Sequence, residues 1–383
     1  MPKKEPSLPK PLPVLVIPDK FKGTLTALQA AQAIHMGWRR GRPGDLLDLL
    51  PMSDGGDGFG EVMGNLLGAK VQWTKTVDAK HRPVKSRWWW DPRTKSAIIE
   101  SAEVVGLAKN PGCHPYDLDT FGVGALLRAA AQRGARKCLV GIGGTATVDG
   151  GFGLAKAMGW KFLDASGNSI ESWTRLGDLV EIISPKRPVH LGELIVAVDV
   201  QNPLLGPRGC ARVYGPQKGL TEFDVADRCL GRLAQISRQK FGRDFAKAPG
   251  AGAAGGLGFG MLAFLGAKLE PGFGVFAVSA KLNTRLKKAD LVITGEGSID
   301  RSTLMGKGVG QIAGLCQRLK IPCLGLAGVL DVKPGSRKLF RGVHALTDVT
   351  NREQAMKNPV YWLEDLASKV ALNFDQPVRR KSA

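Results

Sequence analysis

Short apolar runs recur along the chain, and glycine or acidic residues follow almost every one of them. The runs occupy residues 14–17, 46–50, 137–140, 194–198, 291–293 and 323–326. Apolar stretches of this length that end at glycine are typical of buried β-strands. Helical patterns lie between several of them: Thr26 and Gln29 match a capping box, and Ala27, Ile34 and Trp38 then recur at helical spacing. Strands alternating with helices predict an α/β fold with a parallel, doubly wound sheet of the Rossmann or flavodoxin-like kind.

The stretch from residue 70 to residue 99 has a different pattern. Apolar and polar residues alternate over 71–77, and three tryptophans at 88–90 precede Asp91-Pro92, which is a turn signal. This pattern predicts strands of an antiparallel or mixed sheet, and so a second, mixed α/β domain.

Composition is that of a globular protein with unusual glycine usage. The 383 residues are 43% hydrophobic and 23% charged, and the 50 glycines are clustered. No apolar run approaches the roughly 18 residues of a membrane-spanning helix, and the first 13 residues lack the apolar core of a secretory signal. The six cysteines form no C-x-x-C pair, which argues against a zinc site and favours reduced thiols. We therefore expect a cytoplasmic protein without a membrane partner.

The net charge is strongly positive: 54 basic and 34 acidic side chains give +20. Such a field attracts small anions as readily as nucleic acid. Basic residues and tryptophans interleave between Arg82 and Lys95, which leaves a nucleic-acid-binding protein as an alternative function. No standard nucleic-acid-binding motif occurs, however, and consecutive tryptophans in a predicted strand are more typical of packing, so we expect no specific nucleic-acid partner.

Two glycine-rich segments are candidate binding elements. The segment 141–151 follows a strand and precedes a helical pattern, so the backbone N–H groups of Gly143, Gly144 and Thr145 are candidates for an anion cradle. A tight turn without a ligand is the alternative. The segment 249–260 contains G-x-G-x-x-G, but polar and basic residues precede it where a dinucleotide fingerprint needs a strand. Close helix packing, or a substrate-facing turn near Gly252, is the better interpretation.

Acidic residues follow three of the predicted strands. Asp54 and Asp57 lie on a glycine-rich loop and suit Mg²⁺ or a ligand hydroxyl; solvated loop acids are the alternative. Asp199 stands where a general base would be placed, although a lone aspartate there can also cap a helix. Glu296 and Asp300 precede Lys307, a combination that suits a transferring phosphoryl group or, alternatively, a capped helix start.

Taken together, the motifs resemble the bacterial glycerate kinase family of the type that makes 2-phosphoglycerate. The matching segments are 18–23, 54–58, 141–151, 199–204, 215–219, 249–256 and 295–307, in the family's order. The resemblance implies ATP and Mg²⁺ as cofactors, D-glycerate as acceptor, and an active site in the cleft between two domains. It also implies that the second domain is inserted into the first. We expect a monomer or a homodimer.

The expected domains follow from this resemblance and from the strand patterns. Residues 13–66, 112–150 and 286–375 are assigned to the parallel α/β domain, and residues 67–111 and 151–285 to the inserted mixed domain. Residues 1–12 and 376–383 are expected to be flexible ends.

Motif position and chemistry assign the roles. Asp199 is the expected base for the glycerate C2 hydroxyl. Cations neutralise phosphate or carboxylate, and the candidates are Lys22, Lys218, Lys307 and, as a carboxylate fork, Arg208. Asp19 and Gly252 are further candidates for phosphate or substrate binding. Glu296 and Asp300 are the expected Mg²⁺ ligands, with Asp54 and Asp57 as alternatives.

The chain departs from the family pattern at a few positions. Asp57 stands where glutamate is usual, Val148 where asparagine is usual, and Ser302 where glutamine is frequent; Lys20 and Cys210 replace a frequent serine and alanine. A kinase of another small hydroxy acid or sugar acid is therefore the nearer alternative.

Overall fold

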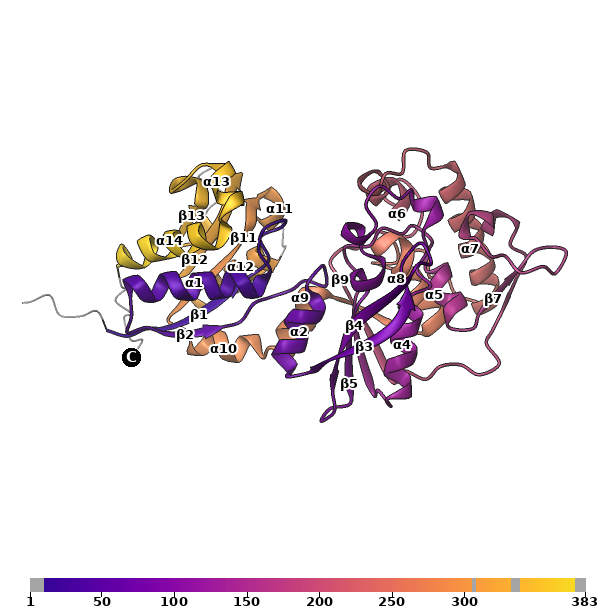
Figure 1. Cartoon of the computed structure of the whole chain (residues 1–383), viewed down its shortest axis with the longest axis horizontal. Helices are drawn as coiled ribbons and strands as arrows, with labels where there is room; N and C mark the ends of the chain where they lie inside the picture. The colour runs from indigo at the N-terminus through magenta and orange to yellow at the C-terminus, as the bar shows by residue number, and fades with distance from the viewer. Residues whose placement is uncertain (1–9, 305–307, 332–337, 376–383) are drawn as a thin grey trace, which may run out of the picture. The chain divides into compact units, whose positions relative to one another are not determined.

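The structure is a computed structural model that describes residues 10–304, 308–331 and 338–375 (Figure 1). The chain packs into two compact units: one comprises the residues up to Ser53 and from Ala277 onward, and the other comprises Asp54–Phe276. Most residues of the expected flexible ends lie outside the described part of the chain. Leu12 is within it and donates its backbone N–H to Asp45 Oδ1 at 3.0 Å, so ordered structure begins before the expected boundary.

The first unit contains a five-stranded sheet whose neighbouring strands are all parallel. The strand order is β13-β12-β11-β1-β2, with β1 Pro13–Pro18, β2 Leu46–Leu49, β11 Leu291–Asp300, β12 Cys323–Asp331 and β13 Gly342–Ala345. In chain order this is the flavodoxin-like arrangement 2-1-3-4-5. The predicted parallel, doubly wound sheet is therefore confirmed.

Helices cover this sheet on both faces. The helices are α1 Ala27–Gly41, α10 Leu282–Lys288, α11 Arg301–Leu304, α12 Gly308–Leu319, α13 Arg352–Lys357 and α14 Pro359–Leu372. The predicted capping box is present at the start of α1, where Thr26 accepts from Gln29 N and Gln29 accepts from Thr26 N. Helices α1 and α14 form one apolar cluster with Val14 and Val16 on one face of the sheet. Helices α10 and α12 also contact the sheet but contribute no residue to this cluster.

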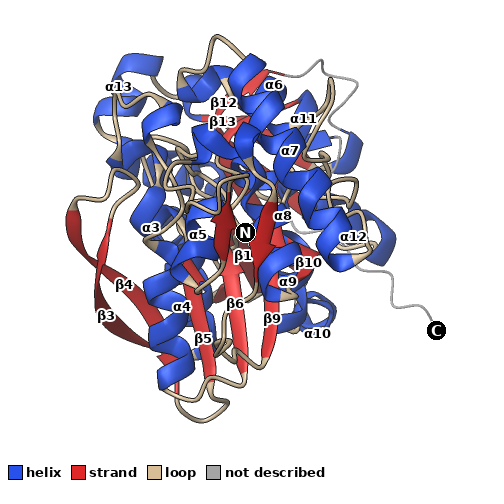
Figure 2. Cartoon of the chain, turned by 90° about the vertical axis from the view of Figure 1, so that its right-hand side faces the viewer, coloured by secondary structure: helices blue, strands red, loops and turns tan. Residues whose placement is uncertain are grey.

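The second unit contains a six-stranded mixed sheet in the order β10-β9-β6-β5-β4-β3. The strands are β3 Lys70–Val77, β4 Pro83–Asp91, β5 Ser96–Glu100, β6 Lys137–Gly141, β9 Glu193–Val198 and β10 Lys268–Pro271. Strands β5, β6, β9 and β10 are parallel to one another, and β3 and β4 continue the sheet in antiparallel pairing. Figure 2 shows β5, β6 and β9 side by side.

The second unit has two apolar clusters. Its helices are α2 Phe59–Leu67, α3 Ala102–Val105, α4 Val123–Gln132, α5 Phe152–Ala157, α6 Cys210–Tyr214, α7 Asp224–Phe241 and α8 Ala253–Leu265, and α9 Gly272–Ser279 begins in this unit and continues past Phe276. Strand β7 Lys161–Leu163 pairs with β8 Glu181–Ile183. One cluster joins the sheet to α4 and α8, and the other joins α5, α7 and α8. Trp88, Trp89 and Trp90 are at most 8% exposed, which confirms that they are packing residues.

The expected domain boundaries differ from the structure. Residues 112–150 were expected in the parallel domain, but β6 lies in the mixed sheet, hydrogen-bonded to β5 on one side and to β9 on the other. Residues 54–66 likewise belong to the second unit. The apolar run of β6 is enough to predict a buried strand, but it does not indicate to which of the two sheets the strand belongs.

Among the residues that the structure describes, no helix is long and apolar enough to span a membrane.

Candidate active site

In the second unit, the carboxyl ends of four parallel strands lie next to one another. Ligands of such sheets bind at this edge. The loop 54–58 is held there by backbone contacts, because Gly143 N donates to Gly55 O at 3.1 Å and a Cβ on Gly55 would lie 2.8 Å from Ala197 O. The structure therefore brings the predicted acidic loop to the predicted glycine turn.

The turn at Gly143–Gly144 allows very close approach of this loop. A Cβ on Gly143 would lie 2.7 Å from Gly56 Cα, and a Cβ on Gly144 would overlap Asp57 Oδ1. Gly144 also has a φ of 75°, in the left-handed region that favours glycine. The glycines are thus required by the backbone, and the Asp57 carboxylate lies against the candidate anion cradle.

Lys218 lies beside the same turn. Its Nζ donates to Thr147 O at 2.7 Å and to Thr145 Oγ1 at 3.3 Å. The side chain is buried, and this desolvation lowers the pKa of the ammonium group to about 8, with Cys210 and Asp149 acting in the opposite direction. Lys218 therefore fixes the cradle loop, and its positive charge lies at the cradle.

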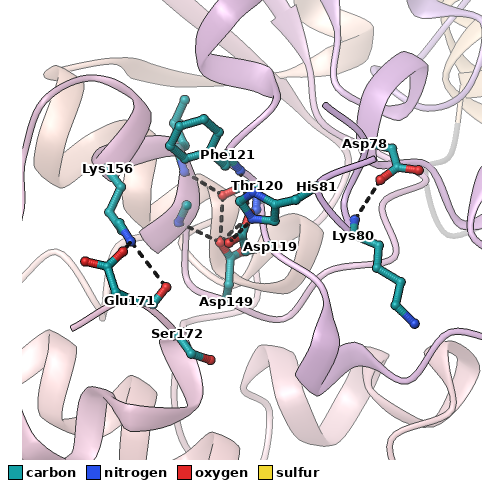
Figure 3. A network of polar contacts seen from close by, with 12 residues as sticks. Asp78, Lys80, His81, Asp119, Thr120, Phe121, Asp149, Lys156, Glu171 and Ser172 are labelled. Atoms are coloured by element: carbon teal, nitrogen blue, oxygen red, sulfur yellow. Dashed lines mark hydrogen bonds and ion pairs between the residues drawn. The ribbon is translucent and has the colours of Figure 1, made fainter. Parts of the chain in front are cut away.

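Asp149, which was not among the predicted site residues, anchors the end of the cradle loop (Figure 3). Its carboxylate is fully buried and accepts from Thr120 N at 3.0 Å, Thr120 Oγ1 at 2.7 Å and Gly153 N at 2.9 Å. Burial, reinforced by the negative charge of Asp119, raises the pKa of Asp149 to about 6. Its position between two pairs of glycines could have marked Asp149 as a site residue. Its hydrogen-bond partner Thr120, however, lies 29 residues away and could not be predicted from the sequence.

The second glycine-rich segment packs against the same loop. Ala254, Gly255 and Gly256 all have left-handed backbone, and a Cβ on Gly255 would overlap Thr147 O. Gly252 N donates to Asn202 O at 2.9 Å. Between the end of α7 and the start of α8 the described chain has no strand, so the interpretation as close packing is confirmed.

Asp199 directly follows β9 and is exposed at the carboxyl edge. No helix starts beside it in the described chain, because α6 begins only at Cys210, so the helix-cap alternative is not supported. Asn202 bridges this region: its Nδ2 donates to Arg208 O at 2.8 Å and its Oδ1 accepts from Tyr214 OH at 2.7 Å. Burial, with the negative charge of Asp199, raises the pKa of Tyr214 to about 12.

In the first unit, the loop after β1 lies beside the second half of β11, at the topological switch point of the sheet, where flavodoxin-like folds bind ligands. Asp19 N donates to Gly295 O at 2.8 Å. A Cβ on Gly297 would lie 2.9 Å from Lys22 N. The predicted residues Asp19 and Lys22 are therefore brought to the segment that contains Glu296.

Thr303 links the two acids of that segment. Its Oγ1 donates to Glu296 Oε1 at 2.7 Å, and its N–H donates to Asp300 Oδ1 at 3.2 Å. Asp300 therefore caps α11, which agrees with the alternative of a capped helix start. Glu296 lies on β11. Lys307 lies outside the described residues.

The residues that the structure describes offer too few ligands to hold a metal ion alone, so a Mg²⁺ site here would need oxygens from the substrate. In the described parts of the chain, no group of three or more His, Cys, Asp or Glu side chains is arranged to hold a metal. Mg²⁺ commonly binds through one or two carboxylates together with phosphate oxygens and water. Glu296 with Asp300 in the first unit, and Asp54 with Asp57 in the second, are the candidate pairs from the sequence.

A glycine-rich turn, a buried lysine and several carboxylates at the carboxyl edges of parallel strands are typical of enzymes that handle phosphorylated substrates. The model of the glycerate kinase family matches residues 14–375. The chain belongs to the glycerate kinase family, and it is a phosphotransferase with an alcohol group as acceptor.

Similar proteins that are named as glycerate kinases support this assignment. The chain is 37% identical to a glycerate kinase of Halalkalibacterium halodurans, over 94% of this chain and 97% of that one. It is 34% identical to the glycerate 2-kinase of Escherichia coli, over 83% and 85%. A crystal structure described as glycerate kinase 2 from Salmonella typhimurium LT2 matches with a TM-score of 0.80 and 32% identity, covering 94% of this chain and 98% of that one.

Proposed function

We propose that the protein transfers the γ-phosphoryl group of ATP to the C2 hydroxyl of D-glycerate, giving 2-phospho-D-glycerate. The observation that carries the proposal is the carboxyl edge of the second unit's sheet, where an anion cradle, a buried lysine and an exposed aspartate follow neighbouring strands. Similarity to a glycerate 2-kinase supports the position of transfer.

The backbone of Gly143, Gly144 and Thr145 binds an anionic group of the substrates. Preorganised N–H groups and a nearby cation stabilise charge that spreads over a transferring phosphoryl group. Lys218 is held by Thr147 O and Thr145 Oγ1, so it acts mainly by fixing the cradle and by its charge. Gly252 supports the Asp199 loop through Asn202.

Asp199 orients the glycerate hydroxyl and accepts its proton. The carboxylate lies at a strand end, exposed to an incoming substrate. Arg208, also exposed and on the same loop, binds the glycerate carboxylate.

In the first unit, Asp19, Lys22 and Lys307 are assigned to phosphate binding, and Glu296 with Asp300 to Mg²⁺, with Asp54 and Asp57 as the alternative pair. Mg²⁺, when bound, would neutralise charge on the phosphate oxygens. Glu296 is the stronger ligand candidate, because Asp300 already caps α11.

A kinase of another hydroxy acid remains the second candidate, and one observation bears on it. Val148, the main departure from the family pattern in the second unit, is 0% exposed inside an apolar cluster. A side chain packed in that way does not contact a substrate, so this departure does not argue against glycerate. We place the reaction in the cytoplasm, where ATP and reduced thiols are available; all six cysteines are free.

The test is ATP consumption by the purified protein with a panel of acceptors. We expect turnover with D-glycerate and Mg²⁺, and a value of kcat/KM at least about tenfold lower for L-glycerate, lactate and sugar acids. Preference for a sugar acid would replace glycerate as the acceptor. No ATP consumption with any hydroxy acid would contradict the proposed function.

A further inference from the structure

Glu100 is a buried carboxylate for which the sequence suggested no role. It is the last residue of β5 and is 4% exposed. Its Oε1 accepts from Gly58 N and its Oε2 from Gly60 N, both at 2.9 Å. Both oxygens are thus committed to the backbone at the start of α2.

Helix α2 has no side-chain cap from its own N-cap residue. Its N-cap residue is Gly58, whose φ of 89° suits glycine and which has no side chain to accept a hydrogen bond. The first N–H groups of a helix have no partner within the helix, and the positive end of the helix dipole favours an anion there. Glu100 supplies both the hydrogen-bond acceptors and the negative charge, and it lies on a strand 40 residues away in sequence.

The residues immediately before α2 are the acidic loop of the candidate site. Asp57 precedes the capped Gly58, and its Oδ1 occupies the space where a Cβ of Gly144 would be. Phe59, which follows, packs against Gly141 at the end of β6. The position of the Asp57 carboxylate at the cradle therefore depends on where α2 begins.

The carboxylate is held at an energetic cost. Burial raises the pKa of Glu100, and the negative charges of Glu103 and Asp57 act in the same direction, while Arg87 is the facing cation. A glutamine would avoid the buried charge but has only one acceptor oxygen. Only a carboxylate can bind both N–H groups at once.

We propose that Glu100 is a positioning residue that holds the loop 54–58, and with it the Asp57 carboxylate, against the Gly143–Gly144 cradle. This inference rests on the proposed function, in which the cradle binds an anionic group of the substrates. Glu100 touches no substrate; it acts through the first turn of α2.

The test is a double-mutant cycle of Glu100→Gln and Asp57→Asn, measured as kcat/KM for ATP and as the Mg²⁺ concentration for half-maximal rate. A small misplacement of a site group can lower the rate by about 100-fold, so we expect each single variant to lose between about 10-fold and 100-fold. Because the two residues act as one unit, the double variant should lose no more than about twofold beyond Asp57→Asn alone. The half-maximal Mg²⁺ concentration should change by the same factor in Glu100→Gln as in Asp57→Asn, because Glu100 acts through Asp57.

The matched control is Glu103→Gln, whose carboxylate accepts hydrogen bonds from Arg87 and Lys109, both outside the loop 54–58. It should keep its kcat/KM within about twofold of wild type. Losses that multiply in the double variant, or an unchanged Asp57→Asn enzyme, would overturn the role of Glu100. If Glu100→Gln does not fold, Glu100→Asp takes its place in the cycle, since it keeps the charge on a shorter side chain.

Failure of the proposed function is recognised separately. A wild-type protein that phosphorylates no glycerate contradicts that function, and the cycle is then measured as binding of Mg²⁺–ATP by calorimetry. The same non-additive loss of affinity is expected. Additive losses, or no loss, would overturn the inference about Glu100.

Discussion

At the scale of single residues, the candidate site contains charged groups that the fold removes from water. Lys218, Asp149 and Glu100 are all buried, and each is held by backbone or hydroxyl groups. Asp199 differs because it is exposed. A buried group is suited to positioning and an exposed one to reaction, which is why Asp199 is the candidate for proton transfer.

Asp199→Asn should leave the fold intact and lower kcat by about 100-fold or more, as expected for the loss of a positioned base. The measurement is steady-state turnover together with circular dichroism. Glu222→Gln, an exposed carboxylate of the same unit, is the control and should retain wild-type turnover. Near-normal turnover of a folded Asp199→Asn variant would remove Asp199 from the catalytic residues.

Asp149 should leave a pH signature on stability. Its pKa is about 6 in the folded chain and 3.8 ordinarily, so the folded state retains a proton that the unfolded state releases between these values. The contribution of this group is therefore full below about pH 4 and is lost as the pH rises to about 6. In energy this difference is about 3 kcal/mol.

The measurement is urea unfolding of wild type and Asp149→Asn at several pH values between about 4 and 7. Because asparagine does not titrate, wild type should lose about 3 kcal/mol relative to the variant across this range. Parallel stability profiles would show that the carboxyl is not perturbed as described.

At the scale of elements, the sequence predicts which segments form strands but not which strands pair with one another. Every predicted apolar run became a strand, and the capping box began α1 where expected. The assignment of β6 to the parallel domain was wrong, because strand pairing depends on contacts that are remote in sequence. Asp149 and Glu100 were missed for the same reason: their partners lie 29 and 40 or more residues away.

The packing of α8 on the cradle loop can be tested with matched glycines. Gly255→Ala places a methyl group on Thr147 O and strains a φ of 69°, so we expect a loss of more than about 3 kcal/mol in unfolding free energy, or failure to fold. Gly134→Ala has a similar φ of 75° with nothing within 4 Å, and should lose only about 1 kcal/mol. Equal losses would mean that backbone strain, and not packing, accounts for the glycine at 255.

At the scale of the whole molecule, the net charge of +20 needs a physical role. The three consecutive tryptophans that suggested base stacking are buried, although Trp73 on β3 is 57% exposed with Lys85 over its ring. We expect the charge to act through long-range attraction of ATP and glycerate, and not through a dedicated nucleic-acid site.

Salt dependence distinguishes these roles. At physiological ionic strength exposed charges interact only within about 8 Å, so the apparent affinity for ATP should fall modestly as salt rises while turnover at saturation changes little. Oligonucleotides should bind weakly, without sequence preference and with a steep salt slope. A sequence-selective, submicromolar complex at physiological salt would support the nucleic-acid alternative instead.

Phosphorus NMR of the product tests directly whether phosphate is transferred to the C2 oxygen of D-glycerate. Phosphorus on the C2 oxygen is coupled to a single proton, whereas phosphorus on the C3 oxygen is coupled to the two protons of a methylene group. We predict a phosphomonoester signal that is a doublet and that forms only with ATP and D-glycerate present together. A triplet would place the phosphate on the C3 oxygen, and the absence of a phosphomonoester would show that glycerate is not the acceptor; either result contradicts the proposed reaction.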